Sequence, residues 1–309
     1  MKIVTPSVSI INEPDILKRI ELAGRVCYKS EERITENSAE KFVRNIIKSG
    51  HDSVLEHSNI IIRANTRDAS DCLIEILNQY EEDGDIPHYI RRSRWQNLFV
   101  NVFSGNVRAW RSLVKAFPDA EPWCVFSNNV LFEDLKGKHM TYDEFWMPSG
   151  YSIIPYAPGK KHNIITSKFI CSRGVSHELV RHRLHSFSQE STRYVRYSDI
   201  EYIEPWWIDE GMWTGDEKLC RKVGARFEIF NAAAREAEAR YGEYIAGGDV
   251  AQLARGVLNH DTKTEVVLTA TISQWERFIT LRNSNAAHPD IRRLAQDFAM
   301  QTIDLRKEI

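Results

Sequence analysis

The chain has 309 residues, of which 42% are hydrophobic and 27% are charged, and its formal net charge is −2. These proportions are typical of a folded protein with one large or two small domains, and the near-neutral charge argues against a general nucleic-acid binder. The five cysteines are scattered without a Cys-x-x-Cys pair, so neither a disulfide framework nor a cysteine zinc site is indicated. No apolar run approaches the length of a membrane span, and the N-terminus lacks the apolar core of a signal peptide. We therefore expect a cytoplasmic protein with no membrane partner.

The N-terminal part is predicted to begin with a short strand and two helices. The apolar pair Ile3–Val4 predicts the strand, and Asn12 followed by Pro14 predicts the start of the first helix. Asn37 and Glu40 have the spacing of a capping box, in which the two residues satisfy each other's backbone N–H groups. This pattern predicts the start of the second helix.

A histidine segment follows the second helix. Gly50 predicts the end of that helix, a strand is predicted at Ile60–Ile62, and Asp68 is predicted to cap a third helix. Glu56 and His57 lie just before the strand, a place where a histidine is usually an ordinary loop residue.

Residues 81–161 give the weakest pattern, and we predict that they are an insertion within the same domain, because no linker rich in Gly, Ser or Pro bounds them. One part of this segment resembles a later one. Trp110 lies in a strand–turn–helix pattern at residues 99–114, and Trp275 lies in the same pattern at residues 266–279. Convergent patterning and an internal repeat explain two such copies equally well.

The remaining elements are predicted from hydrophobic periodicity, beginning with a strand at Ile164–Cys171. Helices are predicted at Gly174–Arg181, Glu217–Tyr241, Val250–Leu258, Gln274–Leu281 and Pro289–Ile303.

Residues 181–196 combine arginine, histidine, serine and tyrosine so densely that they cannot form the apolar face of a helix or strand. Guanidinium groups are always charged and present a planar fork of donors that suits phosphate and carbonyl oxygens. A solvated basic surface is the plainer interpretation of such a cluster. Here, however, neutral hydrogen-bonding side chains alternate with the charges, and this pattern favours a nucleotide-binding site.

Two other chemistries are not supported, and we expect no metal site. A zinc-protease helix needs histidines four positions apart, whereas Arg181 stands four positions after His177 and His182 comes one later. Ser191 lacks the Gly-x-Ser-x-Gly turn of a serine nucleophile, so we expect its hydroxyl to donate a hydrogen bond to a substrate. No glycine-rich dinucleotide or phosphate loop occurs, so side chains must hold any dinucleotide.

Three further arginines are candidates for substrate chemistry. Arg193 and Arg255 could each bind phosphate through bidentate hydrogen bonds. Arg292 is the candidate for a charge beside a pyrimidine ring that loses its N3 proton, because a guanidinium stabilises the developing anion. An exposed helix arginine is the plainer interpretation of Arg292.

The sequence Arg181-His182-Arg183, followed after seven residues by Ser191 and then by Arg193, resembles the signature of the flavin-dependent thymidylate synthase family. The resemblance extends over three regions in the order that the family has them. These regions are Gly50–Ser58, Phe169–Arg196 and Arg255–Arg293.

The resemblance implies a role for each matching residue. The residues implied to bind FAD are His57, Arg181, His182, Arg183, Gln189 and Arg282. Those implied to bind deoxyuridine monophosphate (dUMP) are Glu178, Arg181, Ser191, Arg193, Arg255 and Arg292, of which Ser191 and Arg292 are implied to be catalytic.

Two positions depart from the family pattern. Glu178 stands where many members have glutamine, and Ala286 stands where a polar flavin ligand is common. Asn285 and His288 are the two candidates to compensate for Ala286.

The resemblance also implies a fold, a reaction and partners. It implies an α+β fold with an antiparallel sheet and helices packed around it, in one domain spanning residues 1–309, assembled as a homotetramer with shared active sites. The implied reaction is the reductive methylation of dUMP to thymidylate, with 5,10-methylenetetrahydrofolate as one-carbon donor and FAD reduced by NADPH as hydride source. The alternatives are an RNA- or nucleotide-binding module without redox chemistry and a hydrolase acting on nucleotides.

Overall fold

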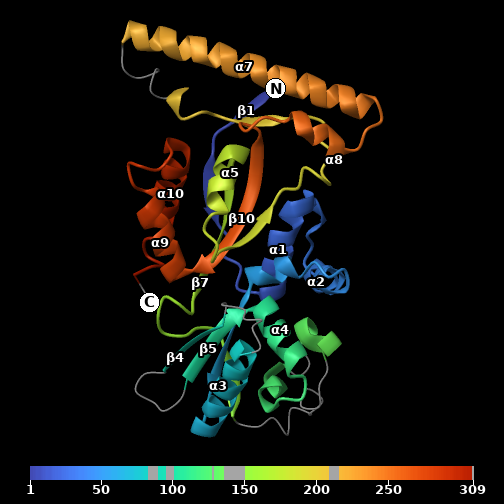
Figure 1. The fold of residues 1–309 in the computed structure, drawn as a ribbon, viewed down its shortest axis with the longest axis vertical. Helices are drawn as coiled ribbons and strands as arrows, with labels where there is room; N and C mark the ends of the chain where they lie inside the picture. Colours follow the sequence, from blue (N-terminus) through green and yellow to red (C-terminus); the bar gives the residue numbers. More distant parts are fainter. Residues whose placement is uncertain (83–89, 95–100, 127–128, 136–149, 209–215, 308–309) are drawn as a thin grey trace.

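The computed structural model describes residues 1–82, 90–94, 101–126, 129–135, 150–208 and 216–307. The molecule is elongated, and three layers follow one another along its long axis (Figure 1). A long helix, α7, crosses one end, a first sheet with α3 and α4 forms the other end, and a second sheet with α5, α9 and α10 lies between them.

The two main sheets each have four strands, and every strand pair within them is antiparallel. The first sheet has the order β4-β5-β3-β6, with the strands Arg91–Arg94, Asn101–Asn106, Asn59–Ala64 and Tyr151–Ile154. The second sheet has the order β2-β7-β10-β8, with the strands Ser7–Ile10, Ile164–Ser172, Lys263–Thr271 and Ser186–Gln189.

The predicted α+β class and antiparallel pairing are confirmed, but the structure contains two such sheets where one was predicted. A separate parallel pair joins β1 (Lys2–Val4) to β9 (Glu201–Ile203).

Aromatic side chains form the core of the second sheet. Three helices pack against this sheet, namely α5 (Arg173–Leu179), α9 (Ile272–Arg282) and α10 (Pro289–Gln301). Phe169, Trp275 and Phe298 are fully buried there, and the rings of Trp275 and Phe298 are stacked with centroids 4.1 Å apart. Since a buried aromatic side chain removes a large apolar area from water, this cluster fixes α9 and α10 on the sheet.

A separate aromatic core supports the first sheet. Its helices are α3 (Arg67–Glu82) and α4 (Val107–Ala116), and helices α1 (Ile16–Tyr28) and α2 (Ser38–Lys48) lie beside it. Trp110, Trp123, Phe126 and Phe132 are all buried in this core, and the last two rings stack at 3.9 Å. Short 3₁₀ turns complete this part of the chain at Glu31–Arg33, Asp52–His57, Glu121–Phe126 and Val130–Leu135.

The predicted start of the first helix was wrong by one turn. Asp15, and not Asn12, caps α1, because its carboxylate accepts hydrogen bonds from the backbone N–H groups of Leu17 and Lys18. A carboxylate at this place also interacts favourably with the positive end of the helix dipole.

The predicted capping side chains of the next two helices were wrong as well. Asn37 lies at the start of α2 but makes no capping bond, and Glu40 binds Arg44 on the same helix. Asp68 lies inside α3, and the Thr66 hydroxyl accepts the hydrogen bond at the start of that helix.

The C-terminal half differs from its prediction chiefly in where the helices end. Helix α7 is longer than predicted, whereas the predicted helix at residues 250–258 is a single turn, α8, followed by a 3₁₀ turn. Helix α5 ends before Arg181, so the arginine signature lies in the turn that follows the helix. The observed bounds are Glu217–Ala246 for α7, Ala251–Ala254 for α8 and Arg255–Val257 for the 3₁₀ turn.

The two tryptophans of the repeated sequence pattern occupy the same place in the two sheets. Trp110 donates a hydrogen bond from Nε1 to the carbonyl oxygen of Ile60 at 3.1 Å, and Trp275 donates one to Ile165 at 2.9 Å. Ile60 pairs with Gly105, which is five positions before Trp110. Ile165 pairs with Ala270, which is likewise five positions before Trp275. Convergent patterning does not require this match in register, so the structure favours an internal repeat.

Two buried histidines extend the repeat and link the sheets. His57 precedes β3 of the first sheet, yet its ring nitrogens bond to Thr269 and Ser188 of the second sheet, both at 2.9 Å. His162 precedes β7 of the second sheet, yet its ring bonds to Ser104 and Ser93 of the first sheet at 2.7 and 2.5 Å. In each case Nδ1 faces the neighbouring central strand and Nε2 faces the edge strand, so the two sheets exchange equivalent histidines.

We expect these histidines to make stability depend on pH. Burial lowers the pKa of His57 to about 3, so the folded protein favours the neutral imidazole. The free energy of unfolding should therefore be fully present above pH ~6.5 and fall as the pH drops toward 3, by about 1.4 kcal/mol per pH unit for each such histidine. The free energy of unfolding can be measured with urea at several pH values and plotted against pH. The slope of this plot below pH ~6.5 should correspond to about one proton fewer in His57→Asn than in the parent chain.

Thr269→Val is the matched control for this measurement. It removes a hydrogen-bond partner of His57 without removing the titrating group, so it should lower stability and keep the slope. An unchanged slope in His57→Asn would contradict the assignment.

Candidate functional site

The arginine signature lies in a turn fixed at both ends. Ser172 caps α5 at its N-terminus, and after α5 ends the chain turns through residues 181–185 into β8. Backbone hydrogen bonds hold this turn, including His182 N–H to Leu179 and His185 N–H to His182. Arg181 and Arg183 are exposed, as expected for charged side chains that have no buried partner.

A cavity of about 660 Å³ opens between this turn and helix α9. Residues 181–185 line one side, and Gln274, Arg277, Leu281 and Arg282 line the other, with the 284–287 loop at the rim. Arg181, His182, Arg183 and Arg282, four of the six residues predicted to bind the cofactor, therefore come together. Four guanidinium groups make the cavity strongly positive, which suits an anionic ligand.

Arg282 organises one wall of this cavity. Its Nε donates to Nε2 of His182 at 3.0 Å, and its terminal nitrogens donate to the carboxylate and the carbonyl of Glu178 at 2.8 and 3.1 Å. Burial, together with the charges of Arg282 and Arg277, lowers the pKa of His182 to about 4. His182 is thus a neutral acceptor, and Glu178 neutralises one of the four arginines.

His185 is a cavity residue that the sequence reasoning did not single out. Its ring is buried, and neither ring nitrogen has a hydrogen-bond partner among the described residues. The ring packs edge-on against Trp275 with centroids 4.6 Å apart, and burial lowers its pKa to about 3. The available signal was its place two residues after Arg183, directly before the strand Ser186–Gln189.

Buried polar atoms normally have partners, so His185 is a candidate to contact a ligand in the cavity. Together the four arginines and two neutral imidazoles could hold an anionic cofactor with a hydrogen-bonding ring edge. Within the described ranges, no three His, Cys, Asp or Glu side chains gather in a way that could hold a metal ion.

Two other predicted cofactor residues do not line this cavity. His57 lies in the buried contact between the sheets, where both ring nitrogens are engaged. The amide of Gln189 donates to the hydroxyls of Ser176 and Thr264 at 3.0 and 3.2 Å. Their predicted contact with a cofactor stays a prediction.

The predicted phosphate ligands lie beyond β8, beside helix α8. The Nε of Arg193 donates to Gln252 on α8 at 2.9 Å, and Arg255 begins the 3₁₀ turn that directly follows α8. The hydroxyl of Ser191 accepts a hydrogen bond from the Arg193 backbone at 3.3 Å. Arg255 is thus close in the chain to the contact between Arg193 and Gln252, and none of Ser191, Arg193 and Arg255 lines the arginine cavity. We call these three residues the α8 group.

Arg292 contacts the loop at the cavity rim through Asn285. It lies in the first turn of α10, and its guanidinium donates to the side-chain oxygen of Asn285 at 3.1 Å. The ring of His288 accepts from the Asp290 backbone at 3.3 Å and so caps α10. Both candidates to compensate for Ala286 are thus engaged in positioning α10 and its loop.

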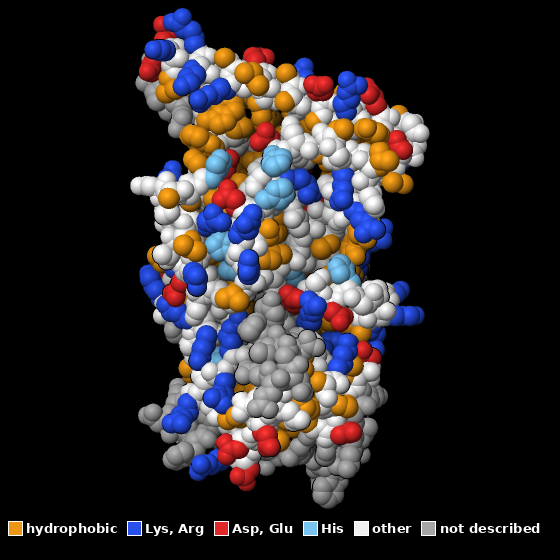
Figure 2. Space-filling view, viewed as in Figure 1, with side chains coloured by type: hydrophobic (Ala, Val, Ile, Leu, Met, Phe, Trp, Pro, Cys, Tyr) orange, Lys and Arg blue, Asp and Glu red, His pale blue; other side chains and the backbone are white. Residues whose placement is uncertain are grey.

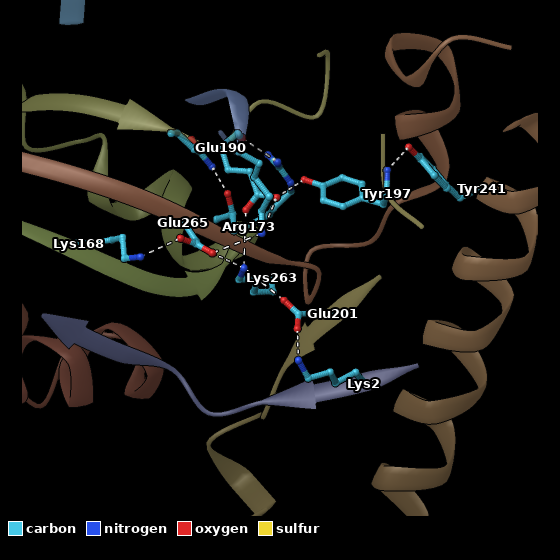
Figure 3. Close-up of polar contacts among 12 residues, drawn as sticks. Lys2, Lys168, Arg173, Glu190, Tyr197, Glu201, Tyr241, Lys263 and Glu265 are labelled. Carbon is cyan, nitrogen blue, oxygen red and sulfur yellow. Dashed lines mark hydrogen bonds and ion pairs between the residues drawn. The ribbon is translucent and has the colours of Figure 1, made fainter. Parts of the chain in front are cut away.

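A buried charge network lies at the far end of β8, next to Ser191 (Figure 3). The carboxylate of Glu190 is fully buried, and the hydroxyl of Tyr197 donates to its Oε1 at 2.6 Å. Lys29 lies 3.8 Å from the same oxygen, and Arg173 donates to the Glu190 carbonyl at 3.3 Å. Glu190 therefore fixes the backbone between Gln189 and Ser191.

Lysines from neighbouring strands complete this network (Figure 3). Lys263 lies 2.5 Å from Glu265 and 3.3 Å from Glu201, and Lys168 lies 3.2 Å from Glu265. Burial opposes ionisation of Glu265, but the hydrogen bond and charge of Lys263 outweigh it and lower the pKa of Glu265 to about 2. The same contacts raise the pKa of Lys263 above its usual value against the effect of burial.

Comparison with known proteins places these residues in a family. The model of the family described as "Thymidylate synthase complementing protein" matches residues 9–72 and 160–304, which is more than half of the chain. The segment between the two matches, residues 73–159, contains β4, β5, α4 and β6 of the first sheet.

The chain is also similar to proteins named flavin-dependent thymidylate synthase. It is 33% identical over 153 residues to that of Mycolicibacterium vanbaalenii, which covers 45% of this chain and 56% of the relative. For Mycobacterium avium the identity is 34% over 142 residues, covering 43% and 55%, and for Mycolicibacterium gilvum it is 36% over 132 residues, covering 40% and 51%. The chain thus spans about half the length of the relatives it matches. In the described part of the chain, no helix combines the length and apolar character needed to cross a membrane.

We expect Arg282 to control the protonation of His182. Arg282→Met removes a positive charge and a donor beside the ring, so the pKa of His182 should rise from about 4 toward its ordinary value. The rise should be incomplete, because burial, the larger cause, persists. An NMR titration of the histidine ring nitrogens measures this shift.

Arg226→Met, on the distant helix α7, is the control for loss of an arginine charge. The assignment is wrong if the pKa of His182 changes equally in the two variants.

Proposed function

This chain belongs to the thymidylate synthase complementing protein family, and we propose that it acts as a flavin-dependent thymidylate synthase. The proposed reaction transfers the one-carbon unit of 5,10-methylenetetrahydrofolate to dUMP and gives thymidylate, with NADPH as the source of electrons. The observation that carries the proposal is the cavity in which Arg181, His182, Arg183 and Arg282 converge, in a chain whose matched segments include all four residues.

The residues of this cavity fit FAD. A pyrophosphate carries negative charge, which guanidinium groups bind in bidentate contacts. Arg181 and Arg183 are exposed, and within the described part of the chain neither forms an ion pair. The unpartnered ring nitrogens of His185 offer a donor and an acceptor to the edge of a flavin ring. When bound, FAD would supply the hydride of the reduction.

The dUMP phosphate is proposed to bind the group beside α8. Arg193 is held by Gln252, which is a neutral partner, so its charge remains available for a phosphate. Arg255 adds a second guanidinium from the end of α8, and the Ser191 hydroxyl can donate to the same ligand. The Glu190 network holds the backbone next to Ser191 in place.

Arg292 is proposed to stabilise the uracil ring as its N3 loses a proton. Its contact with Asn285 is neutral, so its charge is not cancelled by a carboxylate in that contact. A preorganised charge beside a developing anion lowers the barrier without reorganisation during the reaction.

A homotetramer with shared sites is part of the proposal. The cavity and the α8 group lie apart within one chain, and an assembly would allow one chain's cavity to face the α8 group of another. RNA binding is less well supported, since the formal net charge of the chain is −2.

The direct test is anaerobic turnover of the purified full chain with dUMP, methylenetetrahydrofolate and NADPH, scored for thymidylate. The protein should also be yellow, or become so on reconstitution with FAD. A correctly folded chain that binds no FAD at micromolar concentration and forms no thymidylate would refute the proposal. A colourless protein that binds RNA would support the alternative.

Arg292→Ala should lower turnover by about 10²–10³-fold, the scale for losing one preorganised electrostatic donor, with a smaller effect on the Michaelis constant for dUMP. Arg292→Lys should recover part of the rate, because it keeps the charge but loses the planar fork. Flavin reduction by NADPH, followed by stopped flow, should continue in both variants. Parallel loss of flavin reduction and thymidylate formation would place Arg292 in the fold or the flavin site.

A further inference from the structure

The first sheet has a basic cavity of its own, with a volume of about 430 Å³. Strand β4 contributes Arg92, Ser93 and Arg94, strand β5 contributes Asn101, and α3 contributes Arg67, Asp71 and Ile74. In Figure 2, Lys and Arg side chains are spread over the face of the molecule below α7, where the second and then the first sheet lie. This cavity therefore lies on a different sheet from the arginine cavity described above.

Strand geometry directs two of its arginines to the same side. Ser93 bonds to the buried His162 on one face of β4, and successive side chains of a strand point to opposite faces. Arg92 and Arg94 therefore share the other face, and both are exposed. Arg67, from the first turn of α3, also lines the cavity, so guanidinium groups come from both a strand and a helix.

The positive charge of this cavity is poorly neutralised. Asp71 is the acidic side chain of its lining, and it lies 3.7 Å from Arg67, with both side chains mostly exposed. Within the described ranges, no carboxylate lies within ion-pair distance of Arg92 or Arg94. Lys161 donates to the carbonyl of Arg92 at 2.9 Å and adds another cation nearby. Like charges this close favour a bound anion.

The internal repeat gives these arginines a counterpart. Ser93 corresponds to Ser188, since each bonds to Nε2 of an exchanged histidine, and Arg94 therefore corresponds to Gln189. In both sheets a side-chain amide donates to a buried serine near the start of a helix that comes earlier in the chain: Asn101 to Ser70 of α3 at 2.6 Å, and Gln189 to Ser176 of α5 at 3.0 Å. The cavity thus lies on the face of the first sheet that corresponds to the surroundings of Gln189.

Arg92, Arg94 and Asn101 lie outside the segments that the family model matches. We propose that this cavity is a second ligand site, which binds the phosphate group of a small molecule between Arg92 and Arg94 of β4 and Arg67 of α3. A phosphate presents several oxygens in different directions, so it can accept from guanidinium groups on two elements at once. The site does not depend on flavin or on thymidylate formation.

The test is isothermal titration of the full chain at an ionic strength of about 0.15 M with uridine monophosphate, inorganic phosphate and uridine as probes. The parent chain should bind the two phosphate-bearing probes at this site and should not bind uridine there. Arg92→Ala/Arg94→Ala should weaken that binding by roughly tenfold to a hundredfold, the range for losing charge-assisted hydrogen bonds. Tighter binding of uridine monophosphate than of inorganic phosphate would identify a nucleotide ligand, and equal binding would identify the phosphate group alone.

Two controls separate this site from general attraction and from the second-sheet cavity. Arg221→Ala/Arg240→Ala removes the same charge from the exposed surface of α7 and should leave the binding unchanged. Arg181→Ala/Arg183→Ala changes the other cavity, so the binding component that is lost in Arg92→Ala/Arg94→Ala should persist in this variant. Equal weakening in the α7 control would overturn the proposal, as would unchanged binding in Arg92→Ala/Arg94→Ala.

Arg94→Gln provides a milder variant if the double substitution fails to fold by circular dichroism. It introduces the residue type found at the counterpart position and removes one charge from an exposed side chain. It should fold as the parent does and bind phosphate more weakly. Binding equal to that of the parent chain would overturn the proposal.

Discussion

The exchange of two neutral histidines between the sheets is the contact on which the rest of the structure depends. Each imidazole is fully buried and bridges two strands of the opposite sheet, with both nitrogens bonded to hydroxyl groups. Leaving a buried donor or acceptor unpaired costs about 1–3 kcal/mol, so separating the sheets would expose or orphan several groups at once. The strands that follow His57 and His162 are central strands of the two sheets, so this contact sets the relative position of both cores.

That contact also positions the arginine signature. Ser188, which bonds to His57, lies in β8 directly after the 181–185 turn. At the other end of β8, Glu190 is anchored by Tyr197, by Lys29 directly after α1 and by Lys263 of β10. A turn that carries several like charges would otherwise be mobile, and fixing the strand at both ends limits where its guanidinium groups can lie.

Local sequence patterns predicted the buried strands at Ile60–Ile62 and Ile164–Cys171, because hydrophobic periodicity depends on neighbouring residues. They missed the shorter strands β2, β4, β6, β8 and β9. The predictions failed where a contact between residues far apart in the sequence determines the helix cap or the hydrogen-bond partner. Asn12 and Asp15 are both acceptable caps, and only the fold selects Asp15. The bonds from Arg282 to Glu178 and His182 cross about a hundred positions of chain, so no local pattern reveals them. The burial of His57 is likewise set by Thr269 and Ser188, far away in the sequence.

The repeat shows which positions of a shared scaffold are constrained and which are free. Positions that match between the sheets are mostly buried and hydrogen-bonded: the two histidines, the two tryptophans, and the hydroxyls of Ser104 and Thr269. Positions that differ are more exposed, as at the equivalent positions Arg94 in the first sheet and Gln189 in the second. Replacing a buried bonded group incurs the desolvation of its partner, whereas an exposed side chain keeps its contact with water. One scaffold can therefore support two cavities of different chemistry, one in which Arg282 is bound to Glu178 and one in which Arg92 and Arg94 keep their charge available.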